Sequence, residues 1–449
     1  MTSGLKKTLG LRDLVLMNIV AIVGLRWLLT ASQTGYASIG LWFLALILFF
    51  IPQGMTIFFL SRINPNEGGI YLWARDSFGP FHGYITGWCY WINNLIYYPA
   101  LLMFLGGNAL YLFGSRWIHL ADSRLFIALF SLVTLWLIIG LNVRGMSLGK
   151  WLHNLGGIGI WIPMGMLIIM AAIYWSRSGP AETGSLKDLL PDLGQRSTWA
   201  FWSTMCFGFA GLELMSVLGG EIKSAERSIP RAIVISGIGI ASIYILGTLA
   251  LLVALPKAQI GLLNGIVDAI QSLGSSLSYY GVAWTAALFI TLSGLGGVSA
   301  WIAGVARIPF VIGLDRYLPA WIADLHPRWG SPYKSLILQG GLTSLFILIS
   351  VSGSTIREAY LFLLDAEIIL YFIPYLYMFA AGWKLGKDAR GYRLAAGIGG
   401  ITTTLAMIFA LIPPEGVSFL THELKILSVT IGFVGMGVVF FFRKRGNLV

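Results

Sequence analysis

Apolar segments long enough to cross a bilayer recur along the whole chain, separated by short polar segments. A helix rises about 1.5 Å per residue, so about 20 mostly apolar residues span the hydrocarbon core. The pattern predicts twelve membrane-spanning helices, and a short extra helix at residues 261–273 between the seventh and eighth spans. The predicted spans cover residues 13–37, 40–61, 82–106, 124–142, 150–175, 197–221, 231–254, 281–308, 335–352, 356–381, 392–412 and 425–442.

The polar segments are too short to form a separate soluble domain, so residues 1–449 are predicted to form a single transmembrane domain. Composition agrees, because 57% of the residues are hydrophobic and only 11% are charged, against about 25% charged in an ordinary soluble protein. The first apolar segment lacks the short core and cleavage site of a signal peptide, so we interpret it as a span. Cys89 and Cys206 both lie in apolar segments, which excludes a disulfide framework, and no metal or cofactor is expected.

The net charge of +11 comes from the loops. Of the 30 Lys and Arg residues, 21 flank the spans on one side and eight on the other, while Arg26 lies inside the first span. Because Lys and Arg are enriched in cytoplasmic loops, this bias places both termini in the cytoplasm of an inner-membrane protein. The basic residues are spread over short loops rather than gathered on one polar face, which argues against a nucleic-acid partner.

Two spans contain glycines and a charge near their middle: the first at residues 23–27 (VGLRW) and the sixth at residues 207–213 (FGFAGLE). Glycine weakens a helix by about 1 kcal/mol relative to alanine, so both are predicted break points. A break exposes N–H and C=O groups, which lipid tolerates only where they line a cavity or are buried in protein. Half-helix ends can bind the carboxylate and ammonium groups of a small zwitterion. Alternatively, the glycines only allow the helices to pack closely.

Three groups of motifs give the chain a family resemblance. They are residues 207–213 with 220–232 (GEIKSAERSIPRA), residues 66–73 (NEGGIYLW) with 78–83 (FGPFHG), and residues 313–319 (GLDRYLP) with 326–332 (HPRWGSP). The sequence resembles the amino acid–polyamine–organocation (APC) superfamily of transporters over nearly its whole length. Its details are most similar to the glutamate–GABA antiporter branch.

The resemblance implies an all-α membrane protein with the leucine-transporter fold. Two inverted five-helix repeats would cover residues 12–175 and 197–381, with two further helices over residues 392–442. It also implies a non-enzymatic secondary transporter of amino acids or related amines, which works by alternating access with proton coupling or exchange. Its partners would be this small-molecule substrate, protons and membrane lipid. A receptor of the same fold that binds amino acids without transport is the alternative.

The resemblance places the substrate between the two breaks. Val23, Gly24 and Leu25 would hold the substrate carboxylate. Phe207, Phe209 and Ala210 would hold the amino group through their carbonyls, with an aromatic ring closing the site. The neighbouring residues Arg26, Trp27 and Gly211 complete the predicted binding site, and Phe207 is the predicted gate.

Two departures from the family pattern stand out. Many members have small residues throughout the first break, whereas this chain has Gly24-Leu25-Arg26. Some relatives carry a lysine at membrane depth in the fifth span in place of a sodium ion. Here the nearest lysine is Lys150, at the cytoplasmic end of that span.

Four ionisable residues lie far from any span end: Arg26, Glu213, Asp365 and Glu367. A charge at the bilayer centre costs about 2.5–3.5 kcal/mol, so these side chains are predicted to face the protein interior and find partners. Glu213 and Glu367 are candidates for proton coupling. Asp365 and Glu367 point to different faces of one helix, and we favour Glu367.

Arg26 admits three hypotheses. It could bind a substrate carboxylate, which would favour an acidic substrate. It could act in coupling by replacing the missing lysine, tying the first span to the fifth or eighth without sodium. It could instead form an ion pair with Glu213 or Glu367, since an unpaired buried arginine is costly.

The sequence lacks the patterns that are typical of other classes of membrane protein. A membrane-embedded enzyme would show a motif such as HExxH, which does not occur, or a GxSxG strand-to-helix turn. The one GxSxG match, residues 145–149 (GMSLG), lies between two predicted helical spans and follows no predicted strand. A channel would show a repeated pore loop or rings of like charge, which the sequence also lacks.

Overall fold

The computed structural model describes residues 5–181, 185–261, 264–352, 356–412 and 419–446, and the regular structure in these ranges is helical. Within them, eleven helical segments are long and apolar enough to cross a membrane. These are α1 (Leu11–Ile22) with α2 (Leu25–Ser32); α3 (Ala37–Ala45) with η1 (Leu46–Phe50) and α4 (Ile51–Ile63); α6 (Pro80–Ala109); α7 (Arg124–Val143); α8 (Met146–Gly159) with α9 (Trp161–Ser178); α12 (Ala225–Ala254); α14 (Val282–Val305) with α15 (Arg307–Leu314); α16 (Tyr333–Val351); α17 (Ile356–Leu385); α18 (Arg390–Phe409); and α19 (Phe419–Gly446).

The predicted sixth span, residues 197–221, is not one continuous helix. α10 (Arg196–Gly208) ends near its middle, and only the short α11 (Leu214–Val217) follows. Neither piece is long enough to cross a bilayer alone, which is why eleven long segments correspond to twelve predicted spans. Gly211, between the two pieces, has a φ of +129°, a conformation that favours glycine. The first span is also interrupted, between α1 and α2, so both predicted breaks are confirmed.

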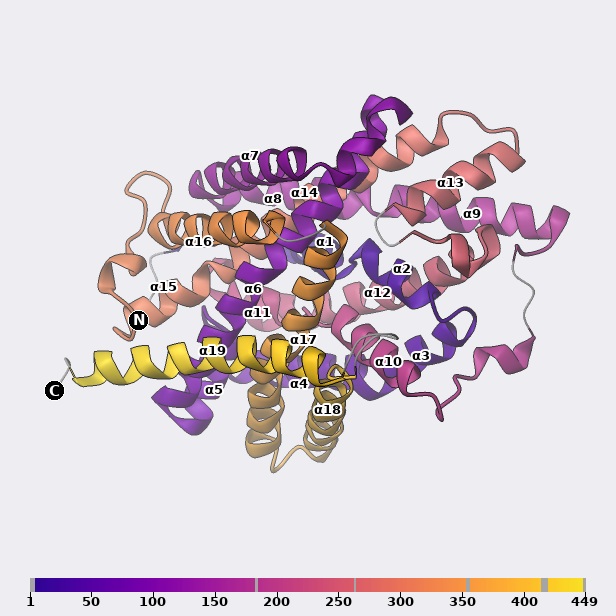
Figure 1. Ribbon diagram of the computed structural model, residues 1–449. Coiled ribbons are helices and arrows are strands. Elements are labelled where there is room, and N and C mark those ends of the chain that lie inside the picture. Colours follow the sequence, from indigo (N-terminus) through magenta and orange to yellow (C-terminus); the bar gives the residue numbers. More distant parts are fainter. Residues whose placement is uncertain (1–4, 182–184, 262–263, 353–355, 413–418, 447–449) are drawn as a thin grey trace.

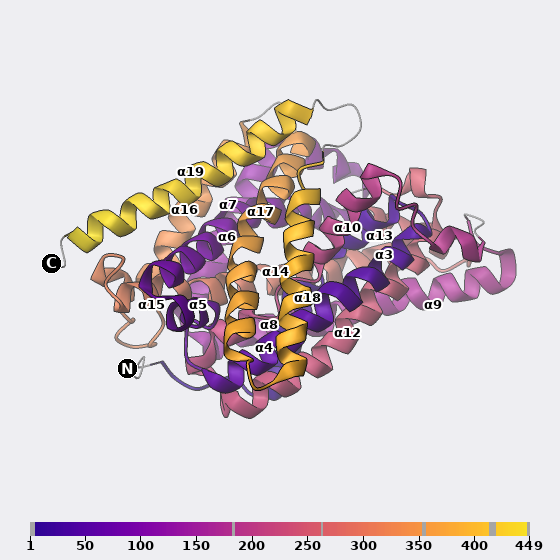
Figure 2. The same ribbon diagram turned by 90° about the horizontal axis from the view of Figure 1, so that it is seen from below.

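α6 runs through the centre of the helix bundle and is buried along most of its length. It packs against α17, α14 and α5 (Ile70–Phe78), while α1 packs against α12, α8 and α14. α17 and α18 form an antiparallel hairpin, and α19 crosses the outside of the bundle (Figures 1 and 2). The described chain begins and ends at the same end of the molecule in both views. The two inverted repeats stay a prediction.

A buried charged cluster, formed by Arg307, Glu221 and Glu67, joins several segments away from the helix breaks. Arg307, which begins α15, places Nη2 2.6 Å from Glu221 Oε1 and Nε 3.8 Å from Glu67 Oε1. The other Glu67 oxygen, Oε2, accepts a hydrogen bond of 2.7 Å from the Gly220 N–H. The main-chain carbonyl of Glu221 also accepts from the N–H of Leu9, at 3.1 Å. One arginine therefore stands between two carboxylates where four segments meet.

Glu67 makes the stability of the protein pH-dependent. Burial raises the pKa of this loop carboxyl well above its ordinary value of 4.5; the Glu221 charge adds to the rise, and Arg307 opposes it. Between the ordinary and the raised pKa, the folded state holds a proton that the unfolded state releases. The free energy of unfolding should therefore fall as pH rises through this window, and Glu67→Gln should flatten that slope. Melting curves from about pH 5 to pH 8 test this. If the slope of Glu67→Gln equals that of the exposed control Glu226→Gln, the prediction is contradicted.

Candidate functional site

Tyr244 of α12 ties the two helix breaks together. Its hydroxyl lies 2.5 Å from the Ile22 carbonyl and 2.9 Å from the Gly208 carbonyl, and it accepts a hydrogen bond of 3.1 Å from the Gly24 N–H. Main-chain groups that the breaks leave without helical partners therefore share one buried side chain. Such groups are tolerated at membrane depth because protein satisfies them.

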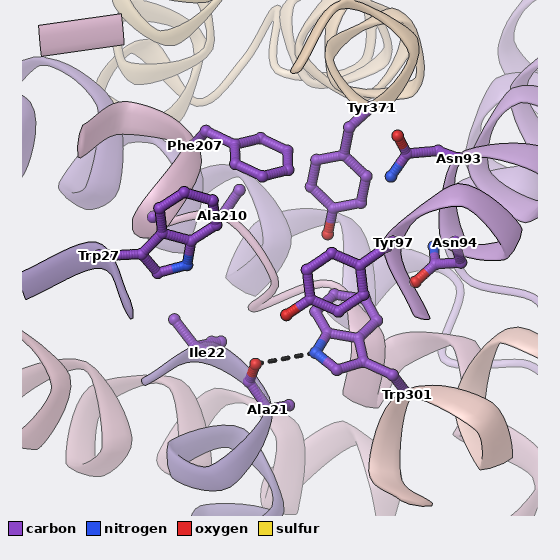
Figure 3. Close-up of a pocket in the computed structure, with 11 residues that line it drawn as sticks. Ala21, Ile22, Trp27, Asn93, Asn94, Tyr97, Phe207, Ala210, Trp301 and Tyr371 are labelled. Atoms are coloured by element: carbon purple, nitrogen blue, oxygen red, sulfur yellow. Dashed lines mark hydrogen bonds between the residues drawn. The ribbon is translucent and has the colours of Figure 1, made fainter. Parts of the chain in front are cut away.

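Two further aromatic side chains bind the broken backbone. Trp301 of α14 donates from Nε1 to the Ala21 carbonyl at 2.8 Å (Figure 3). Tyr375 of α17 accepts a hydrogen bond of 2.7 Å from the Gly211 N–H. Side chains of α12, α14 and α17 thus hydrogen-bond to the backbone at the breaks.

The breaks border two small cavities of about 20 and 30 Å³. Ala21, Tyr97 and Trp301 line both cavities and so form a common wall between them. A volume of this size accommodates about one water molecule. An amino acid therefore requires side chains in the walls to move.

Aromatic rings enclose the first cavity, with Trp27, Phe207, Tyr371, Tyr97 and Trp301 around a common centre (Figure 3). The Phe207 ring packs edge-on against Trp27, with centroids 5.3 Å apart, and against Tyr371, at 5.4 Å. Phe207 belongs to the last turn of α10, beside the break. Rotation of its side chain would enlarge the cavity, which suits the predicted gate.

Asn93 and Asn94 of α6 supply polar groups to the first cavity, opposite Trp27 and Phe207 (Figure 3). Asn94 Nδ2 donates to the Tyr90 carbonyl at 2.8 Å. Among the described residues, buried Asn93 Oδ1 has no hydrogen-bond partner. A buried amide oxygen without a protein partner is a ready acceptor for a ligand ammonium group.

The second cavity is lined by the first break, at Val23, Gly24 and Leu25, and by Ser293 of α14. α2 begins at Leu25, and the N–H groups at the start of a helix lack intrahelical acceptors and carry partial positive charge. The predicted carboxylate-binding residues therefore lie together, beside the residues predicted to hold the amino group. Of the latter, Ala210 and Phe207 line the first cavity.

Glu213, fully buried just after the second break, accepts hydrogen bonds from three tyrosine hydroxyls. Tyr90 donates to Oε1 at 3.0 Å, Tyr371 donates to Oε1 at 2.5 Å, and Tyr375 donates to Oε2. A carboxylate only accepts hydrogen bonds, and three donors satisfy it without a basic partner. Glu213 is therefore connected by hydrogen bonds to α6 and α17, and through Tyr375 to Gly211.

Arg26 faces Glu367 rather than Glu213. Its Nη2 lies 3.5 Å from Glu367 Oε2, and the two side chains are 1% and 0% exposed. The guanidinium also lies over the rings of Trp27 and Tyr97, 4.3 and 4.7 Å from their centroids. Arg26 lines neither cavity. Of the three hypotheses for Arg26, this geometry favours the ion pair.

Besides Arg26, two further predicted binding residues, Phe209 and Gly211, are absent from the walls of both cavities. The Phe209 ring packs against Phe50 and Trp42, with centroids 4.6 and 5.0 Å away, and Gly211 contributes its N–H to Tyr375. A position next to the break does not by itself direct a side chain inward, because successive residues there face different sides. The side chain of Asp365 lies outside the described part of the chain.

Sequence reasoning missed the tyrosines that organise the site: Tyr90, Tyr244, Tyr371 and Tyr375. All four are buried at membrane depth, whereas tyrosine in membrane proteins is enriched at the interfaces. Tyrosine in the middle of a predicted span is therefore a signal that could have identified them.

Removal of the Tyr244 hydroxyl should loosen both breaks at once. Tyr244→Phe keeps the ring, which stacks on Trp42 at 4.5 Å, but leaves buried main-chain groups without partners. We expect a loss of about 1–3 kcal/mol in the free energy of unfolding, read as a lower melting temperature in detergent. Tyr280→Phe, at a side chain that is 89% exposed, is the matched control. Equal melting temperatures of Tyr244→Phe and Tyr280→Phe would contradict the proposal that the Tyr244 hydroxyl holds the two breaks together.

Comparison with known proteins shows the family to which the chain belongs. The Amino acid permease family profile matches residues 9–438. An uncharacterized transporter of Legionella pneumophila is 31% identical over 424 residues, which cover 91% of this chain and 90% of that protein. The serine/threonine exchanger of Bacillus subtilis is 26% identical over 461 residues, covering 99% and 98% of the two chains. The glutamate/gamma-aminobutyrate antiporter of Lactococcus lactis is 22% identical over 427 residues, covering 89% and 84%.

The family match spans both helix breaks and all three groups of motifs identified in the sequence. The many apolar helices make the protein a multi-pass membrane protein. The chain belongs to the amino acid permease family of the APC superfamily, and it is an amino acid or amine transporter.

Proposed function

We propose that the protein is a secondary active transporter that moves an amino acid or related amine across the inner membrane by alternating access. Both termini would lie in the cytoplasm. The observation that carries the proposal is the pair of broken helices, held together by Tyr244 around two adjoining cavities. Discontinuous helices at the midplane are how many transporters bind a substrate and let one bundle rock against another.

In this proposal the substrate carboxylate binds the start of α2 at Val23, Gly24 and Leu25. The ammonium group binds carbonyls near Phe207 and Ala210, together with Asn93. Because Arg26 faces Glu367, we assign it to the ion pair. The aromatic walls at Trp27 and Phe207 then favour a neutral, moderately apolar side chain.

Glu213 and Glu367 are the proposed coupling residues, and Phe207 is the proposed gate. A buried carboxyl group in a membrane protein is typical of proton relays. Two of the relatives are named an exchanger and an antiporter. Proton-driven uptake and substrate exchange are therefore the two modes to compare.

The test uses purified protein in liposomes preloaded with single amino acids or amines, with uptake of labelled substrate measured from outside. We expect exchange or pH-driven uptake of a small set of neutral amino acids. Binding without uptake, read as a melting shift of protein that never exchanges label, would support the receptor alternative. A melting shift with glutamate or aspartate that disappears in Arg26→Gln, while the shift with neutral amino acids persists, would make Arg26 a substrate ligand and overturn the ion-pair assignment.

A further inference from the structure

A large apolar crevice opens on the membrane-facing side of the bundle, away from the two central cavities. Its volume is about 940 Å³, near the upper end of small-molecule pockets at about 300–1,000 Å³. α4 and η1 form one wall, α12 forms the other, and the start of α18 closes one end. α12 and α18 each pack against α4. The turn that leads into α18 lies at one edge of the molecule (Figure 2).

The side walls of the crevice are almost entirely apolar and lie at membrane depth. The rim carries large exposed apolar side chains, among them Ile51, Val234 and Ile238. An apolar groove that faces lipid cannot hold water at low cost. An acyl chain from the bilayer fits both its position and its lining.

The end of the crevice at α18 is polar and positively charged. Arg390, exposed at the first position of α18, lines it together with Gly391 and Tyr392. α18 has no side-chain cap and no acidic residue in its first turn. No side chain of that turn therefore neutralises the partial positive charge at the N-terminus of the helix. Residues 384–393 carry four basic residues and one acidic residue. This charge is complementary to an anionic headgroup.

The deep end of the crevice reaches the back of the second helix break. Leu212, directly after Gly211, lines it. Phe50 also lines it and stacks on Phe209, with centroids 4.6 Å apart. Phe50 ends the π-helical turn η1, a departure from α-helix that often marks functional positions. An occupant of the crevice would therefore contact the break from the lipid side.

We propose that this crevice binds one anionic glycerophospholipid of the surrounding bilayer, with an acyl chain between α4 and α12 and the phosphate at Arg390. The proposed ligand has a negative headgroup, because an apolar chain alone would not explain the basic end of the crevice. The inference does not depend on transport, since it concerns a second site on the outer surface of the bundle.

The test is native mass spectrometry of the full chain in detergent, titrated with dioleoyl phosphatidylglycerol or dioleoyl phosphatidylcholine. The wild type should retain one phosphatidylglycerol at concentrations where phosphatidylcholine is lost. Arg390→Gln should weaken phosphatidylglycerol binding about fivefold, the effect of one basic residue near a membrane surface. Arg144→Gln, at an exposed arginine that lines no described cavity, should leave it unchanged.

A second variant fills the apolar part of the crevice. A Cβ on Gly237 would meet the Phe50 ring at 3.6 Å, an ordinary contact, so Gly237→Leu should fold and displace the acyl chain. Gly435→Leu adds the same side chain to the exposed face of α19 and serves as control. If Gly237→Leu does not fold, Ala241→Leu on the same wall replaces it. Equal binding of both lipids by the wild type, or full phosphatidylglycerol binding by the filled variant, would overturn the proposal.

Discussion

A Glu213→Gln variant should fold and exchange substrate, yet lose accumulation driven by a pH gradient. The Tyr375 hydroxyl accepts hydrogen bonds from the Gly211 N–H and from Gln53 Nε2, both at 2.7 Å, so its own hydrogen must point to residue 213. A glutamine can present its amide oxygen to Tyr375 and its NH₂ group to Tyr90 and Tyr371. Because these two hydroxyls can rotate to accept, the site stays hydrogen-bonded.

The substitution removes the group that would bind and release the coupling proton. We expect pH-driven accumulation in liposomes to fall by roughly tenfold or more, whereas exchange between equal internal and external pools persists. Tyr375→Phe is the matched comparison, since it disturbs the same network but keeps the carboxyl group. It should lower stability by about 1–3 kcal/mol while pH-driven uptake remains. Unchanged pH-driven uptake in Glu213→Gln would transfer the proposed coupling role to Glu367.

The helix breaks could be predicted from sequence because their cause is local. Gly24, Gly208 and Gly211 weaken the helix at their own positions. Because lipid otherwise requires a continuous helix, an interruption within an apolar span is easily recognised in the sequence. Burial of Arg26, Glu213 and Glu367 could be predicted for a similar reason. A charge within an apolar span must face the protein interior, whatever its partner.

The partners could not be predicted, because they depend on how helices distant in sequence are rotated and packed. Tyr244 is 222 residues from Ile22, yet its hydroxyl lies 2.5 Å from the Ile22 carbonyl. The sequence left Arg26 with three hypotheses, and only the packing of α17 beside the first break places Glu367 next to it. The family resemblance predicts a binding role for the Phe209 carbonyl but says nothing about its ring, which the turn at the break directs toward Phe50.

In the buried charged cluster, one arginine, Arg307, balances the charge of two acidic side chains, Glu67 and Glu221. Arg307→Leu should destabilise the fold strongly, because it leaves Glu67 and Glu221 buried with no positive partner in the cluster. Removing one partner from a buried ion pair costs about 3–5 kcal/mol. The expected result is a large fall in melting temperature in detergent, with the exposed control Arg328→Leu close to wild type.

The cause can be separated from a loss of packing by replacing the two acidic side chains of the cluster as well. Replacing a whole buried charged set with neutral groups is often close to neutral in stability. Adding Glu67→Gln and Glu221→Gln to Arg307→Leu should therefore recover most of the lost melting temperature, although it adds two further substitutions. Hydrogen exchange should localise the effect of the single variant to the segments that the cluster joins, around Leu9 and Gly220. If the triple variant melts as low as the single one, unpaired charge is not the cause, and the shape of the Arg307 side chain holds these segments together.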